Sequence, residues 1–256
     1  MNYEDYVNIA KDAAILAGKK IMEVYNASKE IEFESKNDNS PLTIADKKSH
    51  NTIIDILNKT NINILSEESD AIKYESRKNW DEYWLIDPLD GTKEFIKKNG
   101  EFTVNIALIK NNMPFIGIVF CPVNKILYWN DAKKNVYKKK LGQDAKKLNK
   151  RKPIDETSKN LRVVISRSHL NKDTNNYINK LNNPKLISCG SSLKFLYIAD
   201  NQADIYPRFG PTMEWDTAAA HSILRSLNIM VINIEDKTEL SYNKKNLLNP
   251  YFLIKP

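Results

Sequence analysis

The sequence predicts a globular protein with an α+β half, residues 1–155, followed by an α/β half, residues 156–256. Amphipathic helical patterns followed by apolar runs and a hairpin signal predict helices packed on an antiparallel sheet in the first half. Short apolar runs that alternate with helical patterns predict the α/β half. With 256 residues, 41% of them hydrophobic, the chain can bury a sizeable core, as one large domain or as two closely packed halves.

Two helices are expected near the start of the chain. The first, over residues 7–25, carries small apolar residues at three- and four-residue steps, which predicts close packing against another helix. The second begins after Thr43, with Asp46 three residues further on, as in a capping box. On local grounds alone, Asp46 is an acid that favours the helix dipole.

The remaining elements follow from short apolar runs and their periodicity. Strands of the first half are expected at 62–65, 84–86, 102–109, 115–120 and 126–129. In the second half, strands are expected at 161–166, 203–206 and 229–234, and helices at 174–181, 193–199 and 217–227.

The stretch from Trp84 to Phe95 combines the end of a buried strand with two acidic residues. Pro88 cannot donate to a sheet ladder, so strand pairing is expected to stop there. Asp87 and Asp90 flank the turn, while Gly91 lets the backbone approach a ligand with free N–H groups that can face an anion. Carboxylates beside bare backbone suit Mg²⁺ and a bridging phosphate. The plain alternative is an Asp-rich turn that caps the following segment.

Two further acidic positions stand at the ends of predicted elements. Glu67 follows the strand at 62–65, and Asp216 precedes the helix at 217–227. Taken separately, each has an ordinary explanation: a solvated acidic loop for Glu67 and a helix cap for Asp216. Taken together with Asp87 and Asp90, they supply the oxygen ligands of a multi-Mg²⁺ phosphatase site.

At this point the sequence resembles the inositol monophosphatase superfamily of Mg²⁺-dependent, lithium-sensitive phosphatases. The family's signatures Asp-Pro-Leu/Ile-Asp-Gly-Thr and Trp-Asp-x-Ala-Ala both stand here, at 87–92 and 215–219. The resemblance covers nearly the whole chain and implies a layered αβαβα sugar-phosphatase-like fold. The runs at 87–105 and 206–212 are similar to the bisphosphate nucleotidase branch of the family. Glu214 departs from most relatives, and its role cannot be assigned from the sequence.

The resemblance also implies roles for individual residues. Glu67, Asp87 and the carbonyl of Leu89 match ligands of a first metal, and Asp87, Asp90 and Asp216 match those of a second, with two or three Mg²⁺ ions per site. Asp46 and Thr92 match the catalytic pair that orients and deprotonates the attacking water. The substrate-binding residues that it implies are Glu67, Leu89, Asp90, Gly91, Thr92, His169, Ser191, Lys194, Arg208 and Asp216.

The implied activity is hydrolysis of the 3′-phosphate of adenosine 3′,5′-bisphosphate, a by-product of sulfur assimilation, by metal-assisted in-line displacement. An inositol monophosphatase or related sugar phosphatase with the same metals is the first alternative. A basic nucleic-acid-binding protein with a relic acidic motif is the second. Retention of every metal-ligand type argues against the relic.

The formal net charge of +7 is concentrated in lysines between residues 133 and 152. Aromatic residues are sparse there and no nucleic-acid-binding signature accompanies them, so a solvated hairpin and connector is expected rather than a nucleic-acid surface. The resemblance implies a nucleotide bisphosphate, and no nucleic acid, as partner. The basic surface permits peripheral association with the cytoplasmic face of the inner membrane. Monomer and homodimer both remain open.

The sequence favours a cytoplasmic location. No apolar run approaches the length that spans a bilayer, and the first residues lack the basic and apolar regions of a signal peptide. Cys121 and Cys189 lack metal or redox spacing, so reduced, buried cysteines are expected.

Overall fold

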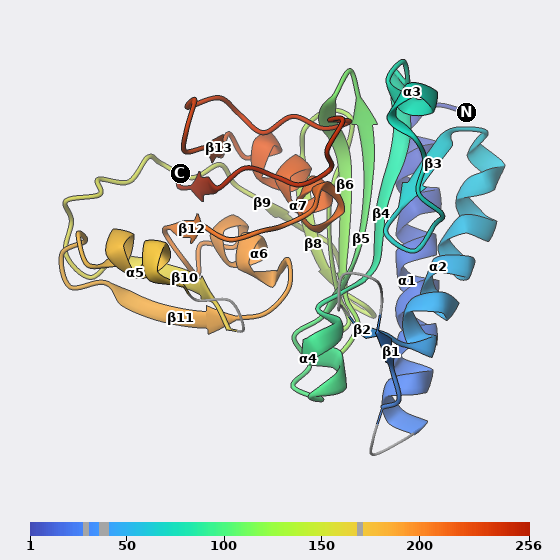
Figure 1. The fold of residues 1–256 in the computed structure, drawn as a ribbon, viewed down its shortest axis with the longest axis horizontal. Helices are drawn as coiled ribbons and strands as arrows, with labels where there is room; N and C mark the ends of the chain where they lie inside the picture. Colours follow the sequence, from blue (N-terminus) through green and yellow to red (C-terminus); the bar gives the residue numbers. More distant parts are fainter. Residues whose placement is uncertain (28–30, 36–40, 168–170) are drawn as a thin grey trace.

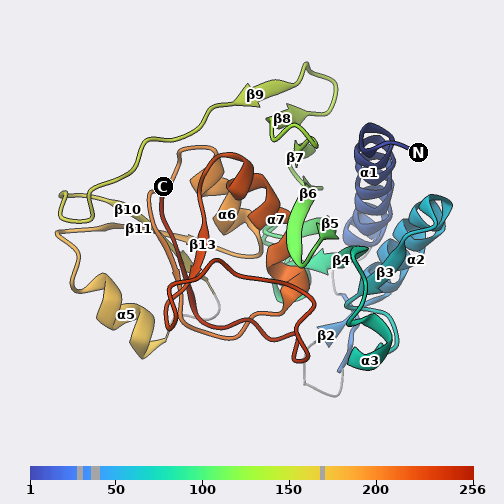
Figure 2. The ribbon, with the colours of Figure 1, turned by 90° about the horizontal axis from the view of Figure 1, so that it is seen from above.

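The computed structural model describes residues 1–27, 31–35, 41–167 and 171–256. Its elements are stacked in layers. Helices α1 (Tyr3–Ala27) and α2 (Ile44–Leu57) cover one face of a large β-sheet, and α7 (Glu214–Ser226) covers the other face (Figure 1). Seen from above, the sheet stands between α1 and α2 on one side and α7 on the other (Figure 2).

Helix α1 packs along α2, as the alanine pattern predicts. Its buried residues are Val7, Ala10, Ala13, Ala14, Ala17, Gly18 and Ile21. Thr43 caps α2: its side chain accepts a hydrogen bond from the N–H of Ala45, and the carboxylate of Asp46 accepts one from the N–H of Thr43. The expected capping box is therefore present.

The large sheet has the strand order β3-β4-β5-β6-β7-β8-β9. Its strands are β3 (Asn63–Ser66), β4 (Glu82–Asp90), β5 (Thr103–Lys110), β6 (Met113–Cys121), β7 (Ile126–Asn130), β8 (Val136–Lys140) and β9 (Lys146–Leu148). Strand β3 runs parallel to β4, while the following pairs are antiparallel. The prediction of an antiparallel sheet is thus wrong for its first pair. A separate short hairpin joins β1 (Glu34–Ser35) to β2 (Pro41–Leu42).

The lysine-rich segment forms the β8–β9 hairpin and the connector that follows it, as expected. Its lysines are mostly exposed, among them Lys146, Lys147, Lys150 and Lys152. Two of its basic residues are held by acids: Lys138 pairs with Asp200, and Arg151 pairs with Asp204.

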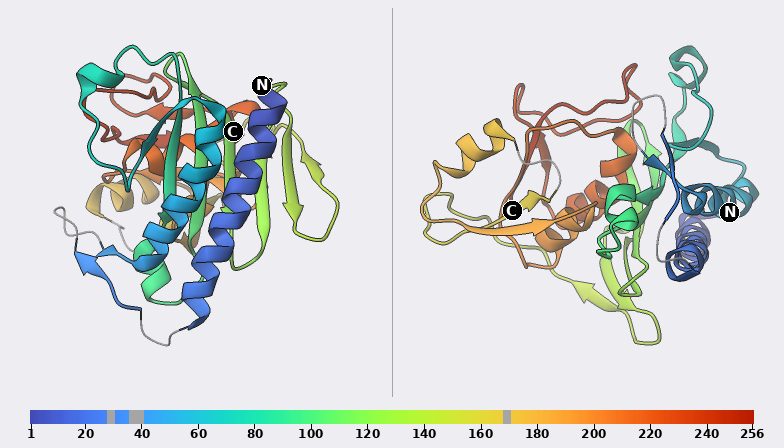
Figure 3. Two further views of the ribbon diagram at one scale, coloured as in Figure 1. Left: turned by 90° about the vertical axis from the view of Figure 1, so that its right-hand side faces the viewer. Right: turned by 60° about the horizontal axis from the view of Figure 1, so that its bottom comes forward.

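The second half contains two small sheets. Parallel strands β10 (Arg162–Ser166) and β11 (Lys185–Cys189) form one, and the other has the order β12 (Tyr206–Arg208), β14 (Phe252–Ile254), β13 (Val231–Asn233). Helix α5 (Lys172–Ile178) lies on the outer side of this half, and α6 (Leu193–Ala199) lies with α7 between the small sheets and the large one (Figure 3). This is the layered α/β architecture that the sequence predicts.

Several predicted bounds of the second half are corrected. The strand expected at 203–206 lies at Tyr206–Arg208, because Ile205 makes only an isolated bridge, to Val163. Helix α7 begins at Glu214 rather than at residue 217. Short helices at Tyr74–Arg77 (α3), Thr92–Ile96 (α4) and Asn58–Thr60 (η1), and strand β14, were not expected.

Among the described residues, two large apolar cores hold the layers together, and a smaller third cluster lies around β10 and α5. One lies between α1, α2 and the large sheet, and the other lies between that sheet, α6, α7 and the small sheets. Helix α7 approaches the sheet closely at Gly117, where an added Cβ would stand 2.1 Å from the carbonyl oxygen of Ala219. A side chain there would force the helix outward, so Gly117 and the alanines of α7 set the depth at which α7 docks.

Both cysteines are free and buried, as expected. Within the described ranges, no helix is long and apolar enough to cross a membrane.

Candidate active site

Asp87 lies near the C-terminal end of β4 and lines a pocket there. Residues Tyr83 to Leu89 are buried, so apolar packing on both faces fixes the strand. Pairing with β5 is interrupted after Asp87 but resumes at Asp90, which lies opposite Thr103. The expectation that pairing stops at Pro88 is therefore wrong: a bulge absorbs the proline, and the bulge places both acids at the pocket.

The parallel β3–β4 pair explains why Glu67 lies near Asp87. Ser66 pairs with Ile86, and the N–H of Glu67 donates to the carbonyl oxygen of Ile86 at 3.1 Å. Parallel strands end at the same edge, so the next residue of each strand projects into one volume. Carboxylate oxygens of Glu67, Asp87 and Asp216 all lie within 4.8 Å of one another.

Asp216 reaches this cluster from the first turn of α7. Its Oδ2 accepts a hydrogen bond from the N–H of Met213 at 2.8 Å, so the carboxylate is oriented by the helix start. Asp216 therefore caps the start of α7, as local reasoning suggested, and also lies beside Glu67 and Asp87.

The cluster is electrostatically costly. Burial, followed by repulsion from Glu67, Asp90 and Asp216, raises the pKa of Asp87 well above its usual value of 3.8. Burial, with Asp90 and Glu67, raises the pKa of Asp216 in the same direction. These raised pKa values indicate that the negative charges of the two carboxylates are not balanced by nearby positive groups. A divalent cation among the oxygens would balance them.

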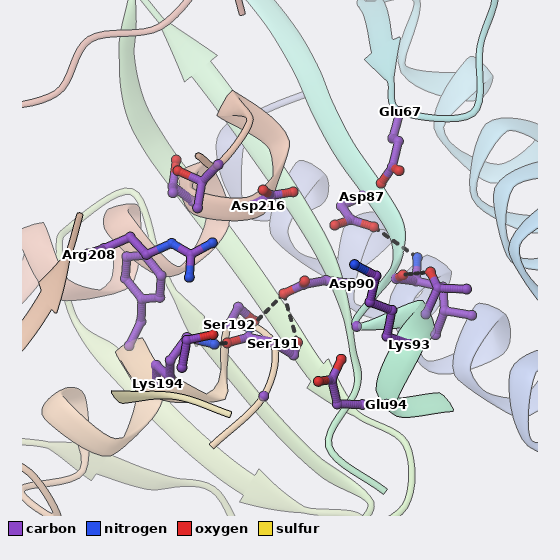
Figure 4. Close-up of a pocket in the computed structure, with 18 of the residues that line it drawn as sticks. Glu67, Asp87, Asp90, Lys93, Glu94, Ser191, Ser192, Lys194, Arg208 and Asp216 are labelled. Atoms are coloured by element: carbon purple, nitrogen blue, oxygen red, sulfur yellow. Dashed lines mark hydrogen bonds between the residues drawn. The ribbon is translucent and has the colours of Figure 1, made fainter. Parts of the chain in front are cut away.

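Asp90 lines the same pocket but turns one oxygen away from the cluster of three. Its Oδ2 accepts hydrogen bonds from the N–H of Ser192 at 2.5 Å and from Ser191 Oγ at 2.7 Å (Figure 4). The same oxygen accepts a third hydrogen bond from Asn105 Nδ2 at 3.3 Å. Burial raises its pKa, and Lys194 and these hydrogen bonds oppose the rise.

Asp46 and Thr92 are brought together, as their predicted pairing requires. Thr92 Oγ1 lies 3.2 Å from Asp46 Oδ1 and 3.2 Å from the carbonyl oxygen of Leu89. The other oxygen of Asp46 accepts from the N–H and the hydroxyl of Thr43 at 2.7 and 2.6 Å. The capping box therefore fixes the carboxylate that meets Thr92.

Gly91 makes the sharp turn between β4 and α4. It has φ 94°, and an added Cβ would meet the carbonyl oxygen of Glu101 at 2.9 Å. Only glycine fits such a position without strain. Residues 89–92 of this turn all line the pocket.

The opposite wall of the pocket carries two buried cations. Figure 4 shows Lys194 and Arg208 across the pocket from Glu67. Lys194 donates to the carbonyl oxygen of Ser191 at 2.5 Å, and burial lowers its pKa, against the attraction of Asp90. Arg208 donates from Nη2 to the carbonyl oxygen of Pro211 at 2.7 Å, while its buried Nε has no hydrogen-bond partner within the described ranges.

The structure thus brings nearly all the predicted site residues to one pocket. Its lining includes Glu67, Asp87, Leu89, Asp90, Gly91, Thr92, Ser191, Lys194, Arg208 and Asp216. Asp46 does not line the pocket itself but is hydrogen-bonded to Thr92. His169 lies outside the described residues.

Sequence reasoning missed a set of polar residues that support the pocket. Thr103 Oγ1 lies 2.8 Å from the hydroxyls of both Ser191 and Ser192, and Ser192 donates to Asn105 Oδ1 at 2.9 Å. The available signal was a threonine and an asparagine two residues apart on an otherwise apolar buried strand. Buried Glu94 also lines the pocket, next to the recognised motif.

The chain is similar to known proteins over most of its length. A model of the inositol monophosphatase family matches residues 2–251. The chain is 44% identical over 241 residues to the 3′(2′),5′-bisphosphate nucleotidase CysQ of Salmonella typhimurium, covering 93% of this chain and 94% of that protein. It is 45% identical over 210 residues to the CysQ protein of Buchnera aphidicola, covering 81% and 77%.

Solved structures agree. The crystal structure of CysQ from Bacteroides thetaiotaomicron, a bacterial member of the inositol monophosphatase family, superposes with a TM-score of 0.86 at 42% identity, covering 99% of this chain and 97% of that one. An inositol monophosphatase from Anabaena shares the fold, with a TM-score of 0.74 at 21% identity, covering 100% of this chain and 92% of that one.

Proposed function

Because the chain belongs to the inositol monophosphatase family, we propose that its pocket hydrolyses the 3′-phosphate of adenosine 3′,5′-bisphosphate to AMP and phosphate. The CysQ relatives bear the name of this activity, and the match spans nearly the whole chain. Recycling of a by-product of sulfur assimilation is the corresponding physiological role.

The observation that carries the nucleotidase assignment is the pair of buried cations opposite the acidic cluster. A nucleotide bisphosphate holds its second phosphate several ångströms from the scissile one, beyond the reach of metals at Glu67, Asp87 and Asp216. Lys194 and Arg208 lie on that far wall, and a guanidinium can bond two phosphate oxygens at once. Ser191 and His169 are the other proposed nucleotide contacts.

The acidic cluster fits Mg²⁺, since its donors are all oxygens, and burial followed by their mutual repulsion raises the pKa values of Asp87 and Asp216. We propose that Glu67, Asp87 and the Leu89 carbonyl hold a first ion, and that Asp87, Asp90 and Asp216 hold a second, with two or three ions in all. Bound Mg²⁺ supplies Lewis acidity that neutralises phosphoryl oxygens and lowers the pKa of water.

Thr92 and Asp46 are proposed to orient the attacking water. A hydroxyl has one donor and two acceptor sites. Donation from Thr92 Oγ1 to Asp46 leaves the lone pairs of Thr92 to accept a hydrogen bond from water, and Asp46 is the nearby base. The backbone N–H groups around Gly91 and Thr92 would bind the scissile phosphate and stabilise its developing charge.

The test is phosphate release from adenosine 3′,5′-bisphosphate, inositol 1-phosphate and fructose 1,6-bisphosphate, each with Mg²⁺ and with a chelator. We expect Mg²⁺-dependent release with the nucleotide preferred. A preference for inositol 1-phosphate would make the sugar-phosphatase alternative correct. No release from any of the three would remove the enzymatic assignment.

A further inference from the structure

Glu214 is fully buried two residues before Asp216, yet it does not line the pocket. Its Oε2 accepts the N–H of Asn243 at 2.8 Å. Its Oε1 accepts the N–H of Lys244 at 3.0 Å and the Lys244 ammonium at 2.6 Å. These three donor groups all belong to the loop at residues 242–249, which we call the C-terminal loop. A buried carboxylate with several donors is expensive to displace, so this contact fixes the first turn of α7 to the loop.

The C-terminal loop is in turn held by Arg77 of α3. This side chain is only 2% exposed and donates to Asn243 Oδ1 at 2.7 Å and to the carbonyl oxygen of Lys244 at 2.8 Å. Asn243 Nδ2 donates back to the carbonyl oxygen of Arg77 at 2.8 Å. The loop is therefore anchored to the segment between β3 and β4, the two strands that supply Glu67 and Asp87.

A second set of contacts connects the same loop to the residue that orients Asp216. Asn249 Nδ2 donates to the carbonyl oxygen of Met213 at 2.8 Å and to Thr217 Oγ1 at 3.1 Å. The N–H of Glu214 donates to the carbonyl oxygen of Leu247 at 2.9 Å. Met213, held in this way, donates its own N–H to Asp216 Oδ2. Residues 213, 214 and 217 are all held by the loop, and Asp216 lies among them.

We propose that Glu214 is a positioning residue for Asp216 and acts through the C-terminal loop. This inference rests on the proposed function, in which Asp216 is a metal ligand. Ligand groups keep their geometry through the contacts that hold them, and losing such a contact weakens metal binding even when the ligands are intact. Glu214 thereby couples α7 to the β3–β4 side of the site without touching substrate.

The test is Glu214→Gln, examined by titration calorimetry with Mg²⁺ in the absence of substrate and by the Mg²⁺ dependence of turnover. Glutamine keeps the shape of the glutamate side chain, but its NH₂ group would face the N–H and ammonium groups of residues 243 and 244. We expect Mg²⁺ affinity to fall about 10- to 100-fold, with kcat at saturating Mg²⁺ much less affected. The matched control is Asp204→Asn, which neutralises a carboxylate that forms ion pairs with Arg151 and Arg162. It should lower Tm but leave Mg²⁺ affinity unchanged.

Equal Mg²⁺ affinity in wild type and Glu214→Gln, with wild type active, would overturn this inference and leave the proposed function standing. Equal losses of affinity in Glu214→Gln and Asp204→Asn would also overturn it, because the effect would then follow stability alone. A wild-type protein that neither binds Mg²⁺ nor releases phosphate would overturn the proposed function as well. Should Glu214→Gln not fold, Asn249→Ala tests the second set of contacts, with the same loss of Mg²⁺ affinity expected and an unchanged affinity counting against the inference.

Discussion

Asp90 Oδ2 accepts a hydrogen bond from the N–H of Ser192 at 2.5 Å, although 102 residues separate them in the chain. The contact joins the end of β4 to the start of α6, and Ser191 Oγ adds a second bond to the same oxygen. The wall that carries Lys194 is thus tied directly to the acidic motif. A fixed separation between these two walls is what recognition of a substrate with two phosphates requires.

Because of this contact, we expect substitutions of Asp87 and Asp90 to affect stability differently. Asp87→Asn relieves repulsion and keeps an oxygen for the N–H of Leu89, so metal-free Tm should stay level or rise. Asp90→Asn weakens the hydrogen bonds to the second half and should cost about 1–3 kcal/mol. Both variants should lose turnover by about two orders of magnitude or more. Thermal unfolding and phosphate release check this, with Asp55→Asn at an exposed position of α2 as the charge control. Full activity in Asp87→Asn would end the metal-ligand assignment.

Arg208→Ala is expected to weaken turnover of adenosine 3′,5′-bisphosphate mainly through KM. The expected loss is about 1.5–3 kcal/mol, the range for a hydrogen bond to a charged group. Substrates with one phosphate should change much less. Arg225→Ala, which removes a guanidinium paired with Glu239, is the matched control. Equal losses on both substrate classes would make Arg208 structural or part of the catalytic centre.

Thr92→Val should reduce kcat about 10²- to 10⁴-fold, because the isosteric side chain cannot pass a hydrogen bond between water and Asp46. Thr92→Ser restores the hydroxyl and should retain most of the activity. Mg²⁺ binding by calorimetry should be similar in all three proteins. A valine variant with near-normal kcat would remove Thr92 from the catalytic pair.

The rise in Tm that Mg²⁺ produces should grow as the pH rises above 3.8, the usual pKa of aspartate, and through the raised folded-state pKa values of Asp87 and Asp216. Asp87 and Asp216 have raised pKa values in the folded protein, so their protonated forms favour folding below the usual value of 3.8. That contribution is lost as pH rises through the folded-state pKa values, and bound Mg²⁺ replaces the proton. Differential scanning fluorimetry with and without Mg²⁺ measures the difference. In the Asp87→Asn variant the pH dependence of this difference should shrink, and an unchanged slope would contradict the assignment.

Much of the fold could be predicted because local pattern and burial agree. The alanine stripe of α1, the capping box at Thr43 and helix α6 all follow from nearby residues. The bulge after Asp87 did not, since a proline in isolation signals the end of a strand, and only the partner β5 shows where pairing resumes. Strand β14 (Phe252–Ile254) was not predicted.

The site was predicted by residue type more than by position. Four acids at element ends indicated metal chemistry, but nothing local shows that Asp216 meets Glu67, because their contact depends on how α7 docks on the sheet. The role proposed for Glu214 could not be inferred from the sequence either, since the donors to its carboxylate lie in a loop about thirty residues further on. The division at residue 155, and the roles of the site residues, stay predictions.

The docking of α7 at Gly117 has a consequence for the order in which the protein matures. Glu67 and Asp87 come from adjacent strands and can meet early, as soon as β3 and β4 pair. Asp216 joins them only when α7 settles against β6, and the loop that holds α7 follows that helix in the chain. The proposed cation site is therefore incomplete until α7 and the loop at residues 242–249 have folded onto the sheet. Tight Mg²⁺ uptake would then mark the completed molecule rather than any earlier intermediate.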